Sequence, residues 1–391
     1  MRGEWVELSP PSDLVQKLSR QLRLDPLIAR LLINRGITAP EEIKKFLSVE
    51  STLQHDPYQM EGMDEAVSFL LKVRDSGRKI SIFGDYDVDG ITGTAVLFNF
   101  LNAHGWKVDY YIPDRIDEGY GLSADSIDYL AERGTSVILT VDCGITSVEA
   151  VERARFKGID VIITDHHEPR EVLPPAVAIL DPKRVDDPYP FKELAGVGVA
   201  YKLVFALASA IGVSPEEVEK LLEFVSLGTV ADIVPLIDEN RYYVRRGMEL
   251  LARSRNVGLQ TLIKLTGLQS VATSDIAYKL APKLNAAGRM HKATVALELL
   301  LERDERRAWQ LASELLKHNA QRQNVELEIY EQALKKLESD PIYTETYEGF
   351  LKKKKPRTKT PKARRKVKRK AKTTKTATRT KKRKSRTKKK K

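Results

Sequence analysis

The sequence predicts an α/β protein built on a parallel β-sheet. From about residue 64, short apolar runs alternate with helical patterns, and each run stops at a glycine or an acid. This alternation is typical of a parallel sheet whose ligands bind beyond the carboxyl ends of the strands. We expect the α/β domain over residues 61–300, an N-terminal helical cap region over 1–60, a linker helix over 301–339 and a disordered Lys/Arg-rich tail over 340–391.

The net charge of +12 over 391 residues hides two unlike parts. The 40 residues from Lys352 to Lys391 carry 25 Lys and Arg and no acid, which leaves 41 basic and 54 acidic side chains in the first 351 residues. The body is therefore acidic, with a net charge of −13, and the pI near 9.4 belongs to the tail. This excludes the interpretation that the whole chain is a basic nucleic-acid-binding fold.

The remaining composition bounds the class of protein. A single cysteine, Cys143, excludes an internal disulfide framework and a cysteine-based zinc site. The first residues include acids where a signal peptide needs an apolar stretch, and no apolar run approaches the roughly 18–20 residues that span a membrane. We expect a cytoplasmic protein with no membrane partner.

The elements follow in order along the chain. The first 60 residues contain leucines at mixed helical spacing between prolines, and no candidate chemistry. Residues 195–300 are mainly helical, with a helix that starts at Ser214 and leads to Asp232, and Asp304–Glu338 contains no Gly or Pro and predicts one long helix. Between these parts we expect strands over 79–83, 108–112, 136–141, 160–163 and 177–180, with helices over 94–101, 123–132 and 146–157.

Three of these strands end in acids or imidazoles. The segments are Gly84-Asp-Tyr-Asp-Val-Asp-Gly90, Val141-Asp-Cys-Gly144 and Asp165-His-His-Glu-Pro169. Because parallel strands point their carboxyl ends to one edge of a sheet, Asp85, Asp87, Asp142 and His166 can converge there. A fourth acid, Asp232, follows later in the chain.

This residue set predicts a metal centre. Carboxylates that are forced together repel one another and lose their ionisation without a counter-cation. Carboxylates with imidazole suit Mn²⁺, and Mg²⁺ is possible at a carboxylate-rich position. About five such ligands exceed what one ion takes from protein, so we expect two ions about 3.5–4 Å apart that share a carboxylate and a water. Such a pair favours in-line hydrolysis of a phosphoester.

The alternatives are structural or belong to other ligands. A single acid at a strand end is more often a helix cap, and a lone His pair is more often accidental than a ligand set. The Asp-x-Asp-x-Asp-Gly run resembles a calcium loop, but Val96 stands where the loop needs glutamate. Neither a phosphate-loop nor a dinucleotide motif follows a strand. Four signals in order, each after the right element, favour the metal centre.

The motifs together resemble the DHH phosphoesterase superfamily. The four motifs are Gly84–Gly90, Thr140–Gly144, Asp165–His167 and Gly228-Thr-Val-Ala-Asp232. Four further segments resemble the bacterial RecJ family of single-strand-specific 5′→3′ exonucleases: Ile112-Pro-Asp-Arg115, Glu118-Gly-Tyr-Gly121, Leu194-Ala-Gly-Val-Gly198 and Leu284-Asn-Ala-Ala-Gly-Arg289. The similarity runs from about residue 5 to about residue 338.

The resemblance implies roles for individual residues. His167 is expected beside the scissile phosphate, where it polarises a nonbridging oxygen or assists the leaving 3′-oxygen. Asp89 and Asp165 are expected to orient ligands. Arg289 matches an arginine at a substrate phosphate, with an ordinary surface arginine as the alternative. The implied metal ligands are Asp85, Asp87, Asp142, His166 and Asp232, with Asp142 as the bridge, and the implied catalytic residues are Asp87, Asp142 and His167.

The chain departs from the family pattern after Glu338. Members of this type carry a second domain with a Gly-Gly-Gly-His stretch that closes the substrate groove, and RecJ proteins commonly add an oligonucleotide-binding barrel. Nothing after Glu338 resembles either domain, so we expect both to be absent. The basic tail would attract a phosphate backbone without reading sequence, and a solubilising or spurious extension is the alternative.

The resemblance implies a Mn²⁺- or Mg²⁺-dependent exonuclease that hydrolyses single-stranded DNA from the 5′ end, in DNA repair or recombination. The expected partners are single-stranded DNA and a single-strand-binding protein or helicase, at the nucleoid in the cytoplasm. Two alternatives stay open. One is a hydrolase of short oligonucleotides or 3′-phosphoadenosine phosphate, and the other is a non-catalytic nucleic-acid-binding or replication scaffold.

Overall fold

The structure is a computed structural model that describes residues 6–48, 54–115, 117–288 and 293–339. The chain divides into two compact units, residues 1–328 and 329–391. Of the second unit, the described residues comprise only the end of one long helix. The predicted basic tail lies outside the described residues.

Within the first 60 residues, the described parts (6–48 and 54–60) form short helices, as the sequence predicts. They are α1 (Ser12–Leu22), α2 (Pro26–Asn34), α3 (Pro40–Leu47) and the 3₁₀ turn η1 (Pro57–Gln59). Prolines open α2 and α3 at the first helical position, where no backbone N–H is needed. The three α-helices share a small core of their own, made of Val15, Leu18, Ala29, Leu32 and Ile43.

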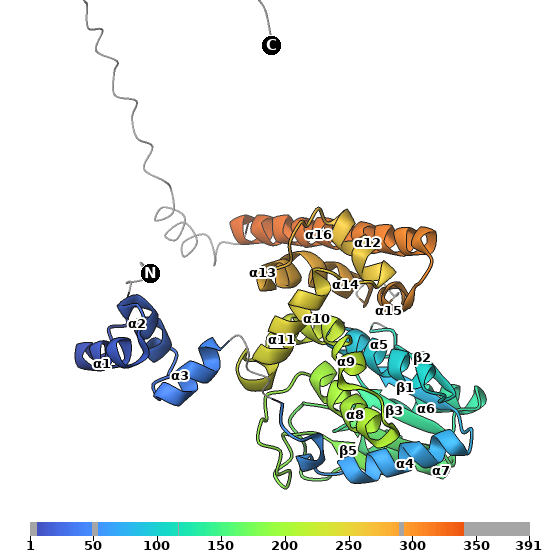
Figure 1. Cartoon of the computed structure of the whole chain (residues 1–391). Coiled ribbons are helices and arrows are strands. Elements are labelled where there is room, and N and C mark those ends of the chain that lie inside the picture. The colour runs from blue at the N-terminus through green and yellow to red at the C-terminus, as the bar shows by residue number, and fades with distance from the viewer. Residues whose placement is uncertain (1–5, 49–53, 116, 289–292, 340–391) are drawn as a thin grey trace, which may run out of the picture. The chain divides into compact units, whose positions relative to one another are not determined.

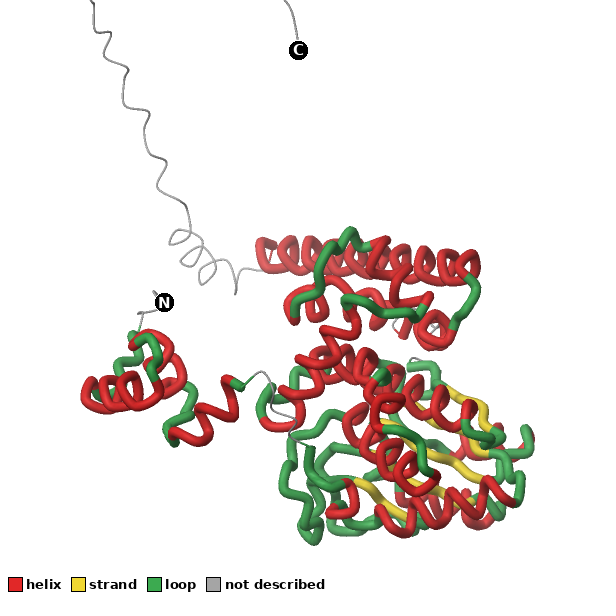
Figure 2. Tube along the Cα trace, in the orientation of Figure 1, coloured by secondary structure: helices red, strands yellow, loops and turns green. Residues whose placement is uncertain are grey.

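The centre of the first unit is a five-stranded, all-parallel sheet (Figure 2). Its strands are β1 (Ile80–Gly84), β2 (Val108–Tyr111), β3 (Val137–Val141), β4 (Asp160–Thr164) and β5 (Ala178–Leu180). The spatial order β2-β1-β3-β4-β5 means that the chain leaves β1 toward one side and later returns to its other side. The gap beyond the carboxyl ends of β1 and β3 is therefore the switch point at which such sheets bind ligands. All five predicted strands are confirmed.

Helices cover both faces of the sheet (Figure 1). On one face, strand residues such as Ile82 and Leu139 pack with α4 (Met63–Asp75), α5 (Val88–Ala103) and α8 (Gly196–Ile211). On the other face, residues such as Phe83 and Ile138 pack with α6 (Ala124–Glu132) and α7 (Val148–Phe156). Because successive strand side chains point to opposite faces and both faces are covered, these strands are apolar along most of their length.

The helix after β1 begins earlier than the sequence predicts. It starts at Val88 and not at Thr94, because the Asp87 carboxylate accepts hydrogen bonds from the N–H groups of Asp89 (2.8 Å) and Gly90 (3.2 Å) and caps the helix there. The acidic motif is therefore the first turn of α5.

The residues after α8 are helical, as predicted, but the single helix predicted between Ser214 and Asp232 is divided into two helices. The helix that starts after Ser214 ends at Glu219, and a separate helix carries the chain to Asp232. At the break, the N–H groups of Leu221 and Phe224 bond to carbonyls three residues earlier, which tightens the turn. The helical elements that follow α8 are α9 (Pro215–Glu219), α10 (Leu222–Ala231), α11 (Asp238–Leu251), α12 (Val257–Leu265), α13 (Thr273–Asp275), η2 (Ile276–Leu280), α14 (Ala281–Gly288), α15 (Ala293–Leu301) and α16 (Glu305–Ser339).

The long helix predicted over Asp304–Glu338 is confirmed as α16. Among the residues that the structure describes, no helix combines the length and apolar character needed to cross a membrane.

A fully buried ion pair joins the segment before η1 to the helices of the body. The Lys202 ammonium on α8 lies 2.5 Å from Glu239 Oε1 on α11 and donates to the carbonyl of His55 at 2.6 Å. The Glu239 carboxylate also accepts from the hydroxyls of Tyr189 (2.5 Å) and Tyr243 (3.1 Å). Because both charges are completely buried, each needs these partners to offset its lost hydration.

Replacing Glu239 by Gln should lower the free energy of unfolding by about 3–5 kcal/mol, because it leaves the Lys202 charge buried without a counter-charge. Urea denaturation of the parent and the Glu239→Gln variant measures this loss. The double variant Lys202→Met/Glu239→Gln should recover much of it, since no uncompensated charge remains. A single variant as stable as the parent would contradict this account.

Candidate metal centre

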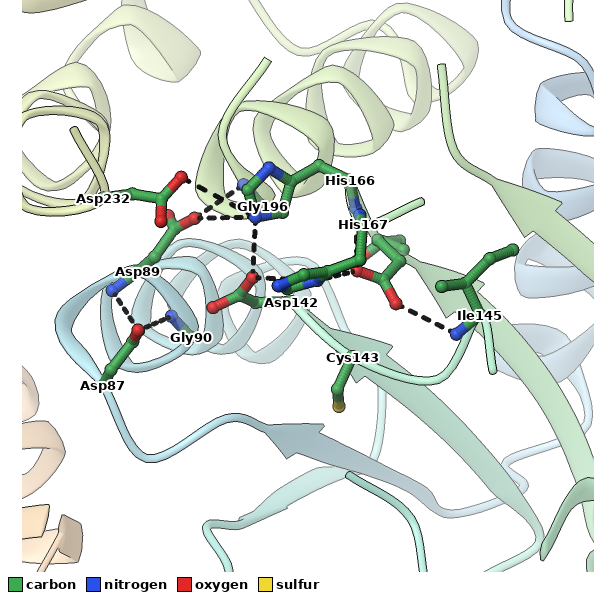
Figure 3. A network of polar contacts seen from close by, with 12 residues as sticks. Asp87, Asp89, Gly90, Asp142, Cys143, Ile145, His166, His167, Gly196 and Asp232 are labelled. Atoms are coloured by element: carbon green, nitrogen blue, oxygen red, sulfur yellow. Dashed lines mark hydrogen bonds and ion pairs between the residues drawn. The ribbon is translucent and has the colours of Figure 1, made fainter. Parts of the chain in front are cut away.

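The acids and imidazoles that the sequence singles out meet at one edge of the sheet. β1, β3 and β4 are neighbours, and Asp85, Asp142 and His166 follow their carboxyl ends. Asp232 reaches the same place from the end of α10. Figure 3 shows Asp87, Asp89, Asp142, His166 and Asp232 around one small region, with the Cys143 sulfur directed away from it.

Three overlapping groups of side chains have donor atoms within 4.8 Å of one another and could hold cations. Together they contain all five ligands that the sequence predicts, and also Asp89 and His167. Asp142 and His166 each belong to two groups, which is the arrangement that two neighbouring ions need. The groups are Asp85, Asp87 and Asp142; Asp142, His166 and His167; and Asp89, His166 and Asp232.

Several donor atoms in this cluster are buried and lack a hydrogen-bond partner among the described residues. They are Asp85 Oδ1, Asp142 Oδ1 and both ring nitrogens of His166. His166 Nε2 lies 3.0 Å from Asp142 Oδ1, 3.7 Å from Asp232 Oδ2 and 3.8 Å from Asp89 Oδ2, so this nitrogen is close to three carboxylates. Leaving buried polar atoms unpaired is costly, and oxygen donors with one imidazole fit Mn²⁺ or Mg²⁺.

The charges in the cluster oppose one another. Burial, with repulsion from Asp87, raises the pKa of Asp85 to about 7. Burial and the neighbouring Asp89 raise the pKa of Asp232 to about 7 and that of Asp142 well above its ordinary value. Burial lowers the pKa of His166, so its ring stays neutral and its nitrogens can bind a metal. A bound cation would therefore displace protons from this site.

The sequence predicts only an orienting role for Asp89, but the structure places its carboxylate in one of the three groups that could hold a cation. Its side chain is buried, and its carboxylate accepts hydrogen bonds from the N–H groups of Gly196 (2.7 Å) and Val197 (2.9 Å) at the start of α8. Those N–H groups have no partner within their own helix, and the positive end of the helix favours a carboxylate there. A side chain at Gly196 would lie 2.7 Å from Asp142 Cβ, so only glycine lets α8 approach this closely.

The Asp165 carboxylate contacts both histidines of the pair. Its Oδ1 accepts from the N–H groups of His166 (2.7 Å) and His167 (3.2 Å) and lies 2.7 Å from His167 Nδ1. Its Oδ2 accepts from the N–H of Ile145 at 2.9 Å. Burial opposes ionisation of Asp165, but these hydrogen bonds outweigh it and hold its pKa below the ordinary value. The hydrogen bond with Asp165 in turn raises the pKa of His167.

Two further residues, Asn285 and Tyr120, make contacts near the cluster, although the sequence predicts no role for them. Asn285 Oδ1 accepts from the N–H of Val88 at 3.0 Å and so steadies the first turn of α5. The Tyr120 hydroxyl lies 3.1 Å from the carbonyl of Asp142 and 3.2 Å from His167 Nδ1. Both residues belong to segments that resemble the RecJ family, Leu284–Arg289 and Glu118–Gly121, and this resemblance is the sequence signal from which they could have been found. Arg289 lies outside the described residues.

Comparison with known proteins agrees with this geometry. Residues 79–229 match the family model described as "DHH family, N-terminal domain". A crystal structure of exonuclease RecJ bound to manganese matches with 36% identity and a TM-score of 0.66, over 71% of this chain and 70% of that chain. The chain belongs to the RecJ group of the DHH family. A structure of RecJ in complex with Mn²⁺ from Thermus thermophilus matches with 32% identity and a TM-score of 0.71, over 85% of this chain and 47% of that one.

The curated RecJ relatives are longer than this chain. The single-stranded-DNA-specific exonuclease RecJ of Bacillus subtilis is 42% identical over 340 residues, which are 86% of this chain and 42% of the relative. The RecJ of Escherichia coli is 38% identical over 78% of this chain and 54% of the relative. The chain thus spans about half the length of the RecJ relatives it matches.

Replacing Asp85 by Asn should stabilise the metal-free protein at pH 8 by roughly 2–4 kcal/mol. The folded-state pKa of about 7 lies above the ordinary value of 3.8, so the stability that this group contributes is complete below pH 4 and lost as the pH rises through 7. Thermal unfolding with EDTA at pH 4 and pH 8 measures the gain, which should vanish at pH 4.

The same variant should lose most of the stabilisation that Mn²⁺ gives the parent at pH 8. Asp75→Asn, which removes an exposed carboxylate at the end of α4, is the matched control and should change neither quantity. An Asp85→Asn variant that Mn²⁺ stabilises as much as the parent would exclude Asp85 as a ligand.

Proposed function

We propose that the chain is a metal-dependent exonuclease that hydrolyses single-stranded DNA in the 5′→3′ direction, in DNA repair or recombination. The observation that carries the proposal is the set of buried carboxylates and imidazole nitrogens without hydrogen-bond partners, among the described residues, at the switch point of the sheet. Membership of the RecJ group supports the substrate and the reaction.

Two ions, Mn²⁺ or Mg²⁺, fit the cluster. Asp85, Asp87, Asp142, His166 and Asp232 would hold them, with Asp142 between the two. Cations bound there would activate a water molecule near neutral pH and neutralise charge on a phosphoryl oxygen. RecJ structures in complex with Mn²⁺ and with Mg²⁺ are known for the relatives, which supports either metal.

The protein's own groups prepare this site. The Asp89 and Asp165 carboxylates fix the start of α8 and the histidine pair, so that the ligand side chains need not reorganise during the reaction. His167 is half exposed at the rim, where a substrate phosphate can reach it, and its raised pKa favours the charged ring that donates to a phosphoryl oxygen. Arg289 is proposed to bind a substrate phosphate.

The basic tail is proposed to add non-specific attraction to DNA. The body carries a net charge of −13 and would repel a phosphate backbone at long range, whereas the tail carries 25 positive charges without an acid. A single-strand-binding protein or a helicase would deliver the substrate at the nucleoid in the cytoplasm.

The alternatives to this function are a hydrolase of short oligonucleotides or 3′-phosphoadenosine phosphate and a non-catalytic scaffold. Rates on a long 5′-phosphorylated strand and on a dinucleotide separate the two hydrolase functions. Mass spectrometry after Mn²⁺ supply separates the scaffold, which would bind no metal.

With Mn²⁺ and end-labelled single-stranded DNA, the full chain should release mononucleotides from the 5′ end. Asp142→Ala should lower kcat/KM by roughly 10³-fold or more, about 4 kcal/mol, because it removes the carboxylate shared by both ions. Cys143→Ala, whose sulfur points away from the cluster, is the control and should cleave like the parent. Full Mn²⁺-dependent cleavage by Asp142→Ala would overturn the proposal.

A version that ends at Gly349 should bind single-stranded DNA more weakly than the full chain. The slope of log affinity against log salt should flatten by roughly 0.7 for each phosphate contact that the tail makes. Fluorescence anisotropy at several salt concentrations measures both quantities. Equal slopes for the two proteins would show that the tail makes no contact with DNA.

A further inference from the structure

We propose that Tyr120 is a positioning residue of the metal centre: its hydroxyl holds the backbone of Asp142 in a left-handed conformation and helps to fix the orientation of the His167 ring. The catalytic consequence rests on the proposed nuclease function, but the structural role does not.

Asp142 has a strained backbone. Its φ is +62°, in the left-handed region that L-residues avoid at a cost of roughly 1–2 kcal/mol. Such a conformation persists only where its surroundings hold it. The N–H of Asp142 donates to the carbonyl of Thr164 in β4 (3.0 Å), and the carbonyl of Asp142 accepts from the Tyr120 hydroxyl (3.1 Å). The residue is therefore held on both sides, once by the sheet and once by Tyr120.

The direction of these hydrogen bonds fixes how the His167 ring is held. A backbone carbonyl can only accept, so the single proton of the Tyr120 hydroxyl is directed to Asp142. Toward His167 Nδ1, at 3.2 Å, the phenol oxygen can then only accept. The Asp165 carboxylate, 2.7 Å from the same nitrogen, is also an acceptor. Nδ1 therefore directs its hydrogen at these two acceptors, and the two contacts together fix the plane of the His167 ring.

The loop that carries Tyr120 is built to bring this side chain back over the sheet edge. Gly119 and Gly121 have φ values of +81° and +77°, which only glycine adopts at little cost. Glu118 anchors the loop, because its carboxylate accepts from the Tyr111 hydroxyl (2.6 Å) and from the N–H of Asp114 (2.8 Å).

The Tyr120 side chain is partly exposed to solvent, but its hydroxyl has two partners within the protein. The residue is 50% exposed, and its ring meets the His167 ring edge to face, with centroids 5.7 Å apart. Burial of the hydroxyl end and the nearby Asp165 raise the pKa of Tyr120, so the hydroxyl keeps the proton that it donates. An ordinary surface tyrosine would instead direct its hydroxyl to water.

The test compares Tyr120→Phe with Tyr111→Phe in the full chain. Both variants remove one hydroxyl, but the Tyr111 hydroxyl bonds to the loop anchor Glu118 and not to the cluster. With Mn²⁺ and single-stranded DNA, Tyr120→Phe should lower kcat about 10–100-fold and leave KM within about twofold, as expected for a group that orients ligands without touching substrate. Tyr111→Phe should leave kcat within about threefold.

A second measurement does not depend on catalysis. Nitrogen-15 NMR of the histidine side chains in the metal-free protein, with His167 assigned from a His167→Gln spectrum, should show a hydrogen on Nδ1 in the parent and in Tyr111→Phe. In Tyr120→Phe the Asp165 contact remains, so Nδ1 should keep its hydrogen, but its chemical shift should change because one of its two acceptors is lost.

Parent-like kcat and an unchanged His167 spectrum in Tyr120→Phe would overturn the proposal. So would an equal loss of kcat in Tyr111→Phe, because the loop as a whole and not the Tyr120 hydroxyl would then be responsible. If the parent itself cleaves no DNA with Mn²⁺, the proposed nuclease function fails, and the NMR comparison alone decides the positioning role.

Discussion

Electrostatic repulsion among buried carboxylates is the constraint that the centre of this protein is built around. Asp85, Asp89 and Asp142 are nearly inaccessible to water, and Asp232 reaches the same region. Hydrophobic packing favours closing the two helical layers on the sheet, but it cannot neutralise these charges. The fold has two means of compensation: backbone N–H groups aimed at some of the carboxylates, and protons or a cation for the rest.

Neighbouring acids of the cluster differ in which of these two kinds of compensation the structure provides for them. Asp89 and Asp165 accept hydrogen bonds from N–H groups of α8 and of the segments after β3 and β4, although burial and the neighbouring Asp87 still raise the pKa of Asp89 to about 7. Asp85 and Asp142 keep oxygens without a partner among the described residues. The backbone around each carboxylate therefore decides whether its oxygens are already paired, which sequence spacing alone does not reveal.

Much of the sheet and of the acidic cluster could be predicted because their signals are local. A short apolar run that ends in an acid marks both a buried strand and the edge to which it points, and so Asp85, Asp142 and His166 were placed together correctly. The predicted start of α5 was wrong because the glycines and threonines of its first turns dilute the apolar pattern, while Thr92 and Thr94 bond within the helix and Asp87 caps it.

What could not be predicted depends on contacts between distant parts of the chain. Asp89 meets the start of α8 across 107 residues, and Asn285 meets the start of α5 across 197 residues. Val218 and Leu222 lie on either side of the break between α9 and α10 and are both buried, and such tertiary packing is not encoded in the propensity of the segment. The position of the Tyr120 hydroxyl depends on a loop conformation that two glycines permit but do not specify.

The buried pair of Lys202 and Glu239 also has a consequence for the order of folding. His55 joins this pair across 147 residues to Lys202 and 184 residues to Glu239, and its docking closes a very long loop. During synthesis the N-terminal helices emerge long before α8 and α11 exist, and their small separate core lets them pack with one another before those helices are made. The pair cannot be neutralised until the chain has been made beyond residue 239, and the N-terminal segment therefore completes the first unit only after the helices on which it rests have packed.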